Sequence, residues 1–413
     1  MKFGSRFLMP LVGLSVLAMQ TPAFAADVLT VSGHARTRMS IDDNINTTTT
    51  PNAANATDTN SVEQWNSRVR MNMDLAPSSS VKVRITPQFT HQWAANANDG
   101  NTARAGTFTT HEAWMAWMPN NMVSLTIGRQ ILSYGSELIV GANDWGTFGN
   151  AFDAVKARFH HNMGTSDFFF AKTVENSAGN TPDNDFWGLY NTLKVGNQFV
   201  STADVYAFWN DQRNHGATRS RIATLGVRAM GAQNGFDYDA ELAYQAGKAN
   251  SIDKKGLMID GDVSTKFMNR HRVGLGFGYA NTEWTEQFPT RHGKMGDADV
   301  IARNNVMNLA IMTNWMWNDQ WTAKVNGYWF MRASTGSNNT PNTAAGYTMM
   351  TGNSDRNLGM EADLVVSYKA DKALGFDLGY AMFKPMSALD KSSNTTRYNQ
   401  TASRTYLQAM VNF

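Results

Sequence analysis

Residues 65–75 read WNSRVRMNMDL, and each even-numbered side chain in this stretch is polar. Because side chains alternate in direction along an extended strand, Val69 and Met71 fall on one face, whereas Arg68 and Arg70 fall on the other. A lysine or arginine that faces lipid at the middle of a bilayer costs about 2–4 kcal/mol. If this strand crosses a membrane, its arginine face must point to enclosed water. The stretch therefore predicts one strand of a transmembrane β-barrel.

The same alternation recurs along the chain, in segments of roughly ten to fourteen residues joined by connections that are in turn short and long. We count about eight short connections and nine long ones rich in Asn, Thr, Gly and Asp, including Leu132–Asn150 and Ala249–Lys254. This count predicts an all-β fold, namely a transmembrane antiparallel up-and-down β-barrel of about eighteen strands, with short periplasmic turns and long extracellular loops. Both termini should lie on the short-turn side.

The start of the chain reads as a secretory signal peptide. Lys2 and Arg6 precede the apolar stretch 7–19, and Ala23-Phe24-Ala25 supplies small residues for cleavage. We therefore predict a signal peptide over 1–25 and a single barrel domain over 26–413, exported to the bacterial outer membrane. The mean hydropathy of −0.39 does not argue against a membrane location, since lumenal residues dilute the lipid-facing ones.

Composition excludes several kinds of site. The chain has no cysteine, which removes disulfides, thiol nucleophiles and thiolate metal ligands. Its formal net charge of +2 is too small to predict nucleic-acid binding. We expect no cofactor, no metal site and no catalytic residue.

Assigning faces by alternation predicts charged residues that line the pore. The basic ones are Arg68, Arg70, Lys82, Arg84, Arg129, Lys156, Arg158 and Arg228. The acidic ones are Glu112, Asp237, Asp239, Glu241, Asp260, Asp262, Glu361 and Asp363. The basic set is either a cationic strip that lowers the barrier for anions or a set of purely structural ion pairs with Asp74, Glu112 or an infolded loop. For the acidic set we favour a solvated channel face over acid–base chemistry or calcium ligation.

Three features leave alternatives open. Simple alternation puts Arg129 on lipid with Ile127, so either a bulge at Gly128 turns it inward, which we favour, or it snorkels above the hydrocarbon. Segment 132–150 either folds into the pore as a constriction or covers the rim. Gly274, Gly276 and Gly278 leave the inner wall almost bare, which predicts that something large packs there, such as an infolded loop.

Three blocks of sequence resemble the alginate-export family of outer-membrane porins. They are Gly128-Arg129-Gln130 with Tyr134–Glu137, Gly141, Asp144-Trp145 and Phe152–Val155; Tyr238–Gly247; and Gly359–Asp363 with Leu378–Tyr380 and Tyr406–Phe413. The resemblance implies an eighteen-stranded barrel and an anion-conducting exporter whose constriction is lined by arginines with acidic residues beside them. Asn150 departs from the family, which often has arginine there, and this weakens the case for tight alginate selectivity.

We therefore predict an outer-membrane porin for passive diffusion of polar, preferentially anionic solutes, such as saccharides, organic acids or an alginate-like polyanion. Its expected partners are outer-membrane lipid, the solute, and the barrel assembly machinery, which should read the last strand through Phe413. One alternative is a plugged barrel that acts as a binding or adhesion protein. A lipase-type barrel is a further alternative, although no motif brings a serine, a histidine and an acid together.

Overall fold

The computed structural model describes residues 28–45, 61–93, 106–174, 183–197, 199–213, 219–249, 252–268, 270–336, 354–390 and 401–413. Its elements, in chain order, are β1 (Val28–Asp43), β2 (Ser61–Ser78), β3 (Val81–Gln92), β4 (Thr107–Asn120), β5 (Val123–Gln130), β6 (Phe152–His161), β7 (Gly164–Val174), β8 (Asn184–Lys194), β9 (Thr202–Arg213), β10 (Arg219–Gln233), β11 (Phe236–Ala249), β12 (Ile252–Phe267), β13 (His271–Ala280), β14 (Val306–Met316), β15 (Trp321–Arg332), β16 (Asn357–Lys369), β17 (Leu374–Pro385), α1 (Ser387–Asp390) and β18 (Ala402–Asn412). The predicted signal peptide lies outside the described residues and stays a prediction.

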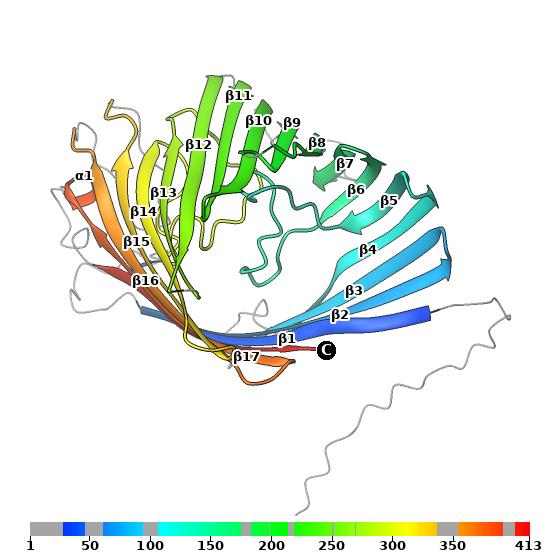
Figure 1. Ribbon diagram of the computed structural model, residues 1–413, viewed down its shortest axis with the longest axis horizontal. Helices are drawn as coiled ribbons and strands as arrows, with labels where there is room; N and C mark the ends of the chain where they lie inside the picture. The colour runs from blue at the N-terminus through cyan, green and yellow to red at the C-terminus, as the bar shows by residue number, and fades with distance from the viewer. Residues whose placement is uncertain are drawn as a thin grey trace, which may run out of the picture.

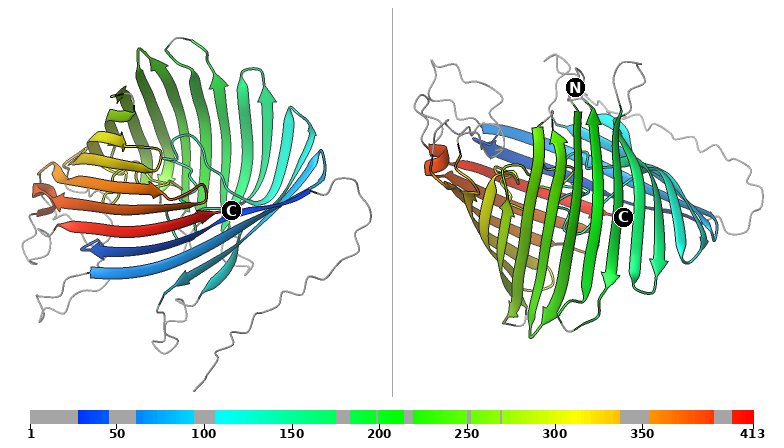
Figure 2. Two further views of the ribbon diagram at one scale, coloured as in Figure 1. Left: turned by 60° about the horizontal axis from the view of Figure 1, so that its bottom comes forward. Right: turned by 90° about the horizontal axis from the view of Figure 1, so that it is seen from above.

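The eighteen strands form one closed barrel. Each strand pairs antiparallel with its sequence neighbours, and β1 pairs with both β2 and β18 (Figures 1 and 2). At the seam, Gly33 N donates to Phe413 O at 2.7 Å and Phe413 N donates to Gly33 O at 3.0 Å. Closure satisfies the backbone groups that an open sheet edge would leave bare in lipid. The predicted fold class is confirmed.

Among the described residues, no helix is long and apolar enough to cross a membrane.

The strand connections differ in length at the two ends of the barrel. At one end, eight turns run from two residues (79–80) to seven (195–201), whereas the other end carries segments as long as 131–151 and 281–305. One expectation was wrong: Ala249–Lys254 is not a long connection. β11 and β12 stay paired up to Ala249 and Ile252, because the alternation that makes them strands continues through these residues.

The two faces of the wall follow the alternation. On β2, Val69 and Met71 are 39% and 37% exposed on the outside, whereas the inward Arg68 and Arg70 are 1% and 5% exposed. On the inner wall, glycines make room for flat aromatic rings on neighbouring strands. A Cβ at Gly188 would overlap the ring of Phe169, its cross-strand partner on β7.

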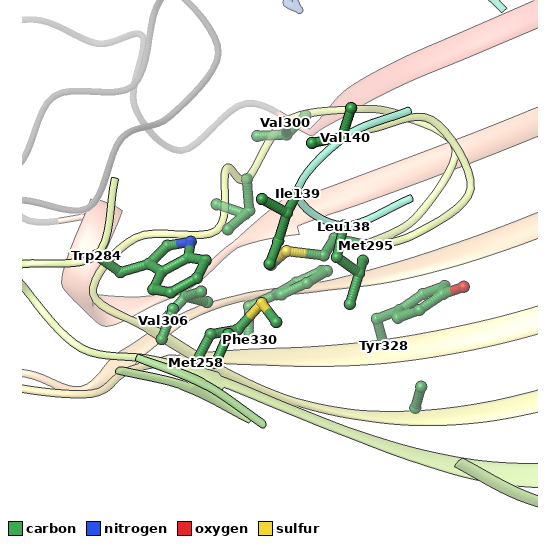
Figure 3. Close-up of a cluster of buried hydrophobic side chains, with 14 of the residues drawn as sticks. Leu138, Ile139, Val140, Met258, Trp284, Met295, Val300, Val306, Tyr328 and Phe330 are labelled. Atoms are coloured by element: carbon green, nitrogen blue, oxygen red, sulfur yellow. The ribbon is translucent and has the colours of Figure 1, made fainter. Parts of the chain in front are cut away.

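Two long connections fold into the barrel, residues 131–151 (the first infolded segment) and residues 281–305 (the second infolded segment), as Figure 1 shows inside the ring of strands. They pair through a parallel bridge between Val140 and Phe288. Their side chains and the inner wall form the buried apolar cluster of Figure 3, which includes Leu138, Ile139, Val140, Met258, Trp284, Met295, Val300, Val306, Tyr328 and Phe330. Segment 132–150 thus lies inside the barrel, the first of its two predicted placements.

Candidate pore constriction

The first infolded segment starts against the aromatic wall of β7, β8 and β9. The Tyr134 ring stacks on the Tyr190 ring with centroids 4.7 Å apart, and its hydroxyl donates to Asp167 Oδ2 at 3.1 Å. Burial and the nearby Asp167 carboxylate raise the pKa of Tyr134, so this hydroxyl keeps its proton and remains a donor. Ser136 Oγ then donates to Glu241 on β11. These contacts hold the segment away from the β5–β6 rim where it originates.

The two infolded segments are joined to each other by hydrogen bonds. Gly141 N donates to Phe288 O at 2.8 Å, and Asn143 N donates to Thr290 Oγ1 at 2.8 Å. Hydrogen bonds of this kind satisfy backbone donors and acceptors that would otherwise be buried without partners. The segments therefore act as one septum, which we define as residues 131–151 together with 281–305.

An arginine cluster on β1 and β2 holds the far side of the septum. Arg68 Nη2 lies 3.0 Å from Asp144 Oδ2, and Arg70 also pairs with this carboxylate. Arg36 Nη1 donates to Asp144 O at 2.8 Å, and Arg38 Nη2 donates to Trp145 O at 3.1 Å. Arginine suits this role because its planar fork presents several donors at once. Arg68 and Arg70 thus bind an infolded loop, as the structural alternative foresaw.

The charge on Asp144 follows from these neighbours. Burial alone would raise the pKa of the Asp144 carboxyl, but the positive charges of Arg68 and Arg70 outweigh it and hold that pKa below its ordinary value. Asp144 is therefore ionised at neutral pH, and it partly neutralises arginine side chains that are almost fully buried.

Trp145 joins the septum and the wall through its ring. Its ring stacks on the His292 ring of the second infolded segment with centroids 3.5 Å apart and planes inclined by 7°. The Arg38 guanidinium lies 3.7 Å from the centroid of the same indole, and Tyr406 on β18 meets it edge-on. This indole of the first infolded segment thus contacts the second infolded segment and the two strands of the seam, β1 and β18.

The second infolded segment is held by acidic residues of β12 and β16. Ala298 N donates to Glu361 Oε1 at 2.8 Å, and Asp297 N donates to Asp363 Oδ2 at 3.1 Å. Arg303 Nη1 donates to Asp260 Oδ2 at 2.6 Å, close to the bare wall at Gly278. Glu361 and Asp363 are both 3% exposed, so they anchor the segment and do not face open water. The packing expected at the glycine strip is present at Gly278.

Four predicted basic residues face the water of the lumen and form what we call the basic wall: Lys82 and Arg84 on β3, and Lys156 and Arg158 on β6. The Arg158 side chain is 42% exposed, whereas its partner Asp167, whose Oδ1 lies 2.6 Å from Arg158 Nε, is 3% exposed. Arg84 is 31% exposed and lies 3.6 Å from Glu112, which is 9% exposed. Arg84 also pairs with Asp74 at 2.7 Å, and that carboxylate is 34% exposed. The arrangement in which the cation reaches the water and the carboxylate lies behind it is therefore clearest at Arg158.

Predicted acidic residues of β11 and β12, namely Asp237, Asp239 and Asp262, form what we call the acidic wall, with the opposite arrangement. Asp239 is 28% exposed and its partner Arg228 13%. Asp237 is 48% exposed and its partner Arg272 33%. Asp262 lies across from Asp239 in the strand register and is exposed. The lumen therefore has walls of opposite sign.

Arg129 lies on the outer face, contrary to the inward orientation that we favoured. Arg129 Nη1 lies 3.0 Å from Asp153 Oδ2. Arg129 comes two positions after the lipid-facing Ile127, and Asp153 two positions before the lipid-facing Val155, so both lie on the outer face. Gly128 has a φ of +121°, yet β5 and β6 pair without a register shift from Val123 to Gln130, so no residue is inserted and the alternation is kept. Arg129 neutralises its charge with an outward aspartate instead.

A family model described as alginate export matches residues 27–403. This chain belongs to the alginate export family. The resemblance inferred from the three sequence blocks is confirmed, and with it the assignment to a family of outer-membrane β-barrel porins. No curated protein sequence gives a significant match.

Solved structures similar to this member of the alginate export family are outer-membrane porins of the Occ/Opd group. They include Pseudomonas aeruginosa OccK2 (OpdF) in complex with glucuronate, with 11% identity and a TM-score of 0.63 over 93% of this chain and 98% of that one. P. aeruginosa OpdK with vanillate has 9% identity and a TM-score of 0.63 over the same shares. Acinetobacter baumannii OccAB3 has 9% identity and a TM-score of 0.61 over 93% and 99%. At these identities the likeness concerns the fold.

Several residues that hold the septum of this family member were not predicted from the sequence. Arg36 and Arg38 lie on β1, where the alternation continues that of β2 and could have revealed them. Arg404 lies on β18 on the same face as Tyr406, so alternation could have revealed it as well. His292 had no such signal, because both it and its partner Asp299 lie on the second infolded segment, whose path no local pattern shows. Within the residues that the structure describes, no group of three or more His, Asp or Glu side chains could hold a metal ion.

Proposed function

We propose that this barrel is a passive outer-membrane channel for small anionic solutes, with carboxylate-bearing sugars and organic acids as the substrate class. The observation that carries the proposal is the unequal exposure within one ion pair of the basic wall, in which Arg158 is 42% exposed and its partner Asp167 3%. Solutes in the water beside this wall therefore meet cationic groups first.

The unpaired lysines of the basic wall add to this effect. Within the described part of the chain, neither Lys82 nor Lys156 makes an ion pair. Lys82 is exposed, whereas Lys156 is half-buried and feels the nearby carboxylates of Asp167 and Glu112, so the charge of Lys82 is the less cancelled of the two. A unit charge about 7 Å from a solute ion in water contributes roughly 0.6 kcal/mol. Such weak and distributed attraction suits conduction, because a solute must both enter and leave.

The neighbouring structures support a carboxylate-bearing solute. OccK2 (OpdF) is seen with glucuronate and OpdK with vanillate, and both ligands carry a carboxylate on a small ring. A polyanion such as alginate presents the same groups in series. We favour a monomeric carboxylate over a polyanion as the solute, because any solute must pass the septum in the lumen and a small one does so more easily.

The test is the ion selectivity of single channels in a planar bilayer, measured as the reversal potential under a salt gradient. Lys82→Gln and Lys156→Gln should each lower the anion-to-cation permeability ratio by about threefold or more, since each removes roughly 0.6 kcal/mol of attraction for anions and also removes repulsion of cations. Arg129→Gln, which removes an equal charge from the outer face, is the control and should leave the ratio unchanged. A ratio unaffected by both lysine variants would overturn the anion preference while leaving a channel.

The solute class needs a second measurement. Added glucuronate should reduce the open-channel current in a concentration-dependent way, and less so in the Lys156→Gln variant. Glucose, which has a similar size and no charge, is the matched solute and should have a weaker effect. Equal effects of the two sugars would contradict a role for the carboxylate.

One observation favours a second candidate, a plugged barrel that binds its ligand without conducting. The septum is anchored on several sides, and Leu132, Val140 and Trp284 within it are each 1% exposed. Such a barrel would show negligible conductance in the same bilayer experiment. Regular current steps would exclude it.

A further inference from the structure

Three arginines cluster on the outer face of β9 and β10, at the end of the barrel that carries the long connections. Arg219 Nε donates to Asp211 Oδ1 at 2.7 Å, while Arg213 and Arg221 approach the same carboxylate at 3.7 and 3.8 Å. Asp211 follows Trp209, which is 41% exposed on the lipid-facing side, by two positions. The cluster therefore points away from the lumen and plays no part in the pore proposed above.

Positive charge exceeds negative charge at this place. Lys172 engages both Asp183 at 2.7 Å and Asp185, the cross-strand partner of Asp211, at 3.0 Å. Together with the three arginines, four cations therefore face three carboxylates on this surface. Two other outward cations each have a carboxylate of their own, Arg129 with Asp153 and Lys248 with Asp253. Here three guanidinium groups share one carboxylate.

The strand register brings like charges directly opposite one another. Arg213 is the cross-strand partner of Arg219, and Arg221 is the cross-strand partner of Lys248. Like charges in such positions destabilise a sheet unless an anion lies between them. The Arg213 Nε is also buried without a hydrogen-bond partner. The arginine side chains nevertheless remain 37–47% exposed, so an anion can reach them.

The position of the cluster identifies the kind of anion. Trp209 and Trp187 are cross-strand partners on the outer face, one step below the charged residues, and both are about two-fifths exposed. Amphipathic tryptophan rings of this kind mark the boundary between hydrocarbon and headgroups. The arginines therefore lie at the level of lipid headgroups, and a phosphate is the headgroup anion that a guanidinium fork binds best.

We propose that Arg213, Arg219 and Arg221 form a binding site for the phosphate of a phosphorylated lipid in the outer leaflet, with Trp187 and Trp209 supporting its apolar part. The phosphate oxygens accept from the guanidinium groups that Asp211 leaves unsaturated. The lipid thereby relieves the repulsion between Arg213 and Arg219 and stabilises this side of the barrel.

Native mass spectrometry of the barrel in a neutral detergent tests the proposal. Titration with bisphosphorylated lipid A should give a saturable complex, and lipid A stripped of its phosphates should bind about tenfold more weakly. The double variant R219Q/R221Q should weaken phosphorylated lipid binding by about tenfold or more, because at least one charge-assisted hydrogen bond is lost. R219K/R221K should recover part of the affinity, since charge is kept but the fork is lost.

Two controls make the outcome decisive. Arg129→Gln removes an equally outward arginine that already has its own aspartate, and it should bind lipid like the wild type. If it weakens binding as much as the double variant, general charge explains the effect and the site does not exist. Equal binding of phosphorylated and phosphate-free lipid would also overturn the proposal. If the double variant fails to assemble, the single variant Arg213→Gln is tested in its place and should also weaken binding of the phosphorylated lipid. Gel mobility before and after heating checks that each variant is folded.

Discussion

Arg68 Nη2 lies 3.0 Å from Asp144 Oδ2, although the two residues are 76 positions apart in the chain. Arg68 is 1% exposed, whereas the Asp144 side chain is 50% exposed. The buried guanidinium of Arg68 thus holds the septum against β2 through the half-exposed carboxylate of Asp144. This relationship explains why strongly basic positions that alternation places in the lumen need not meet the solute.

Asp144→Asn should loosen the septum. The variant removes the carboxylate that faces both Arg68 and Arg70 and should lower the free energy of unfolding by about 1–3 kcal/mol, toward the lower end because Asp144 is half exposed. Single-channel recordings should show larger or noisier conductance. Asp153→Asn is the matched control, because it also pairs with an arginine at 3.0 Å but on the outer face. Equal recordings from both variants would contradict a septum held by this contact.

The same contact predicts a pH dependence. Although burial opposes the shift, Arg68 and Arg70 lower the pKa of Asp144. Its stabilising effect is therefore complete above the ordinary aspartate pKa near 4 and is lost as the pH falls through the lowered value. Wild-type current should be steady at neutral pH and become noisier below about pH 4. The Asp144→Asn variant should lack this change, so the comparison distinguishes titration of Asp144 from titration of the nearby His34. Noise that appears at pH 6 in both proteins would show that a group other than Asp144 causes it.

Trp145→Ala should uncouple the two infolded segments. The substitution removes the ring that lies 3.5 Å from His292 and 3.7 Å from the Arg38 guanidinium. We expect a loss of about 1–3 kcal/mol in the free energy of unfolding, less than for a fully buried tryptophan, together with a larger conductance. Trp117→Ala, on the outer face, should leave conductance unchanged. A larger conductance in the Trp117 variant alone would contradict this role.

Gly188→Ala should destabilise the barrel wall. A Cβ at this position would overlap the Phe169 ring and press on Phe208, and both rings are held in the buried aromatic cluster. Overpacking of this kind costs about 1–3 kcal/mol. Urea unfolding in detergent, followed by tryptophan fluorescence, measures the effect. Gly375→Ala is the control, because the nearest atom to its added methyl would be 3.8 Å away; similar losses for both would rule out the packing explanation.

At Arg129 the alternation of side chains predicted the correct face, whereas our assumption of a bulge at Gly128 was wrong. Alternation alone placed Arg129 outside, and we turned it inward because an unpaired arginine is costly in lipid. The structure instead supplies Asp153 as a cross-strand neighbour, which removes that cost. Strand register between β5 and β6 decides this, and no single-strand pattern reveals it.

The sequence by itself determined the eighteen-stranded barrel, its closure and the direction of side chains along β2, because a period of two is local and hydrocarbon rejects charge at every strand alike. Only the tertiary structure decided which charges meet water. Arg68 and Arg158 have the same pattern in their strands, yet one is sealed against Asp144 and the other is 42% exposed in the lumen. The difference arises from the path of residues 131–151 and 281–305, which is set by contacts between residues far apart in the chain, for which alternation has no rule.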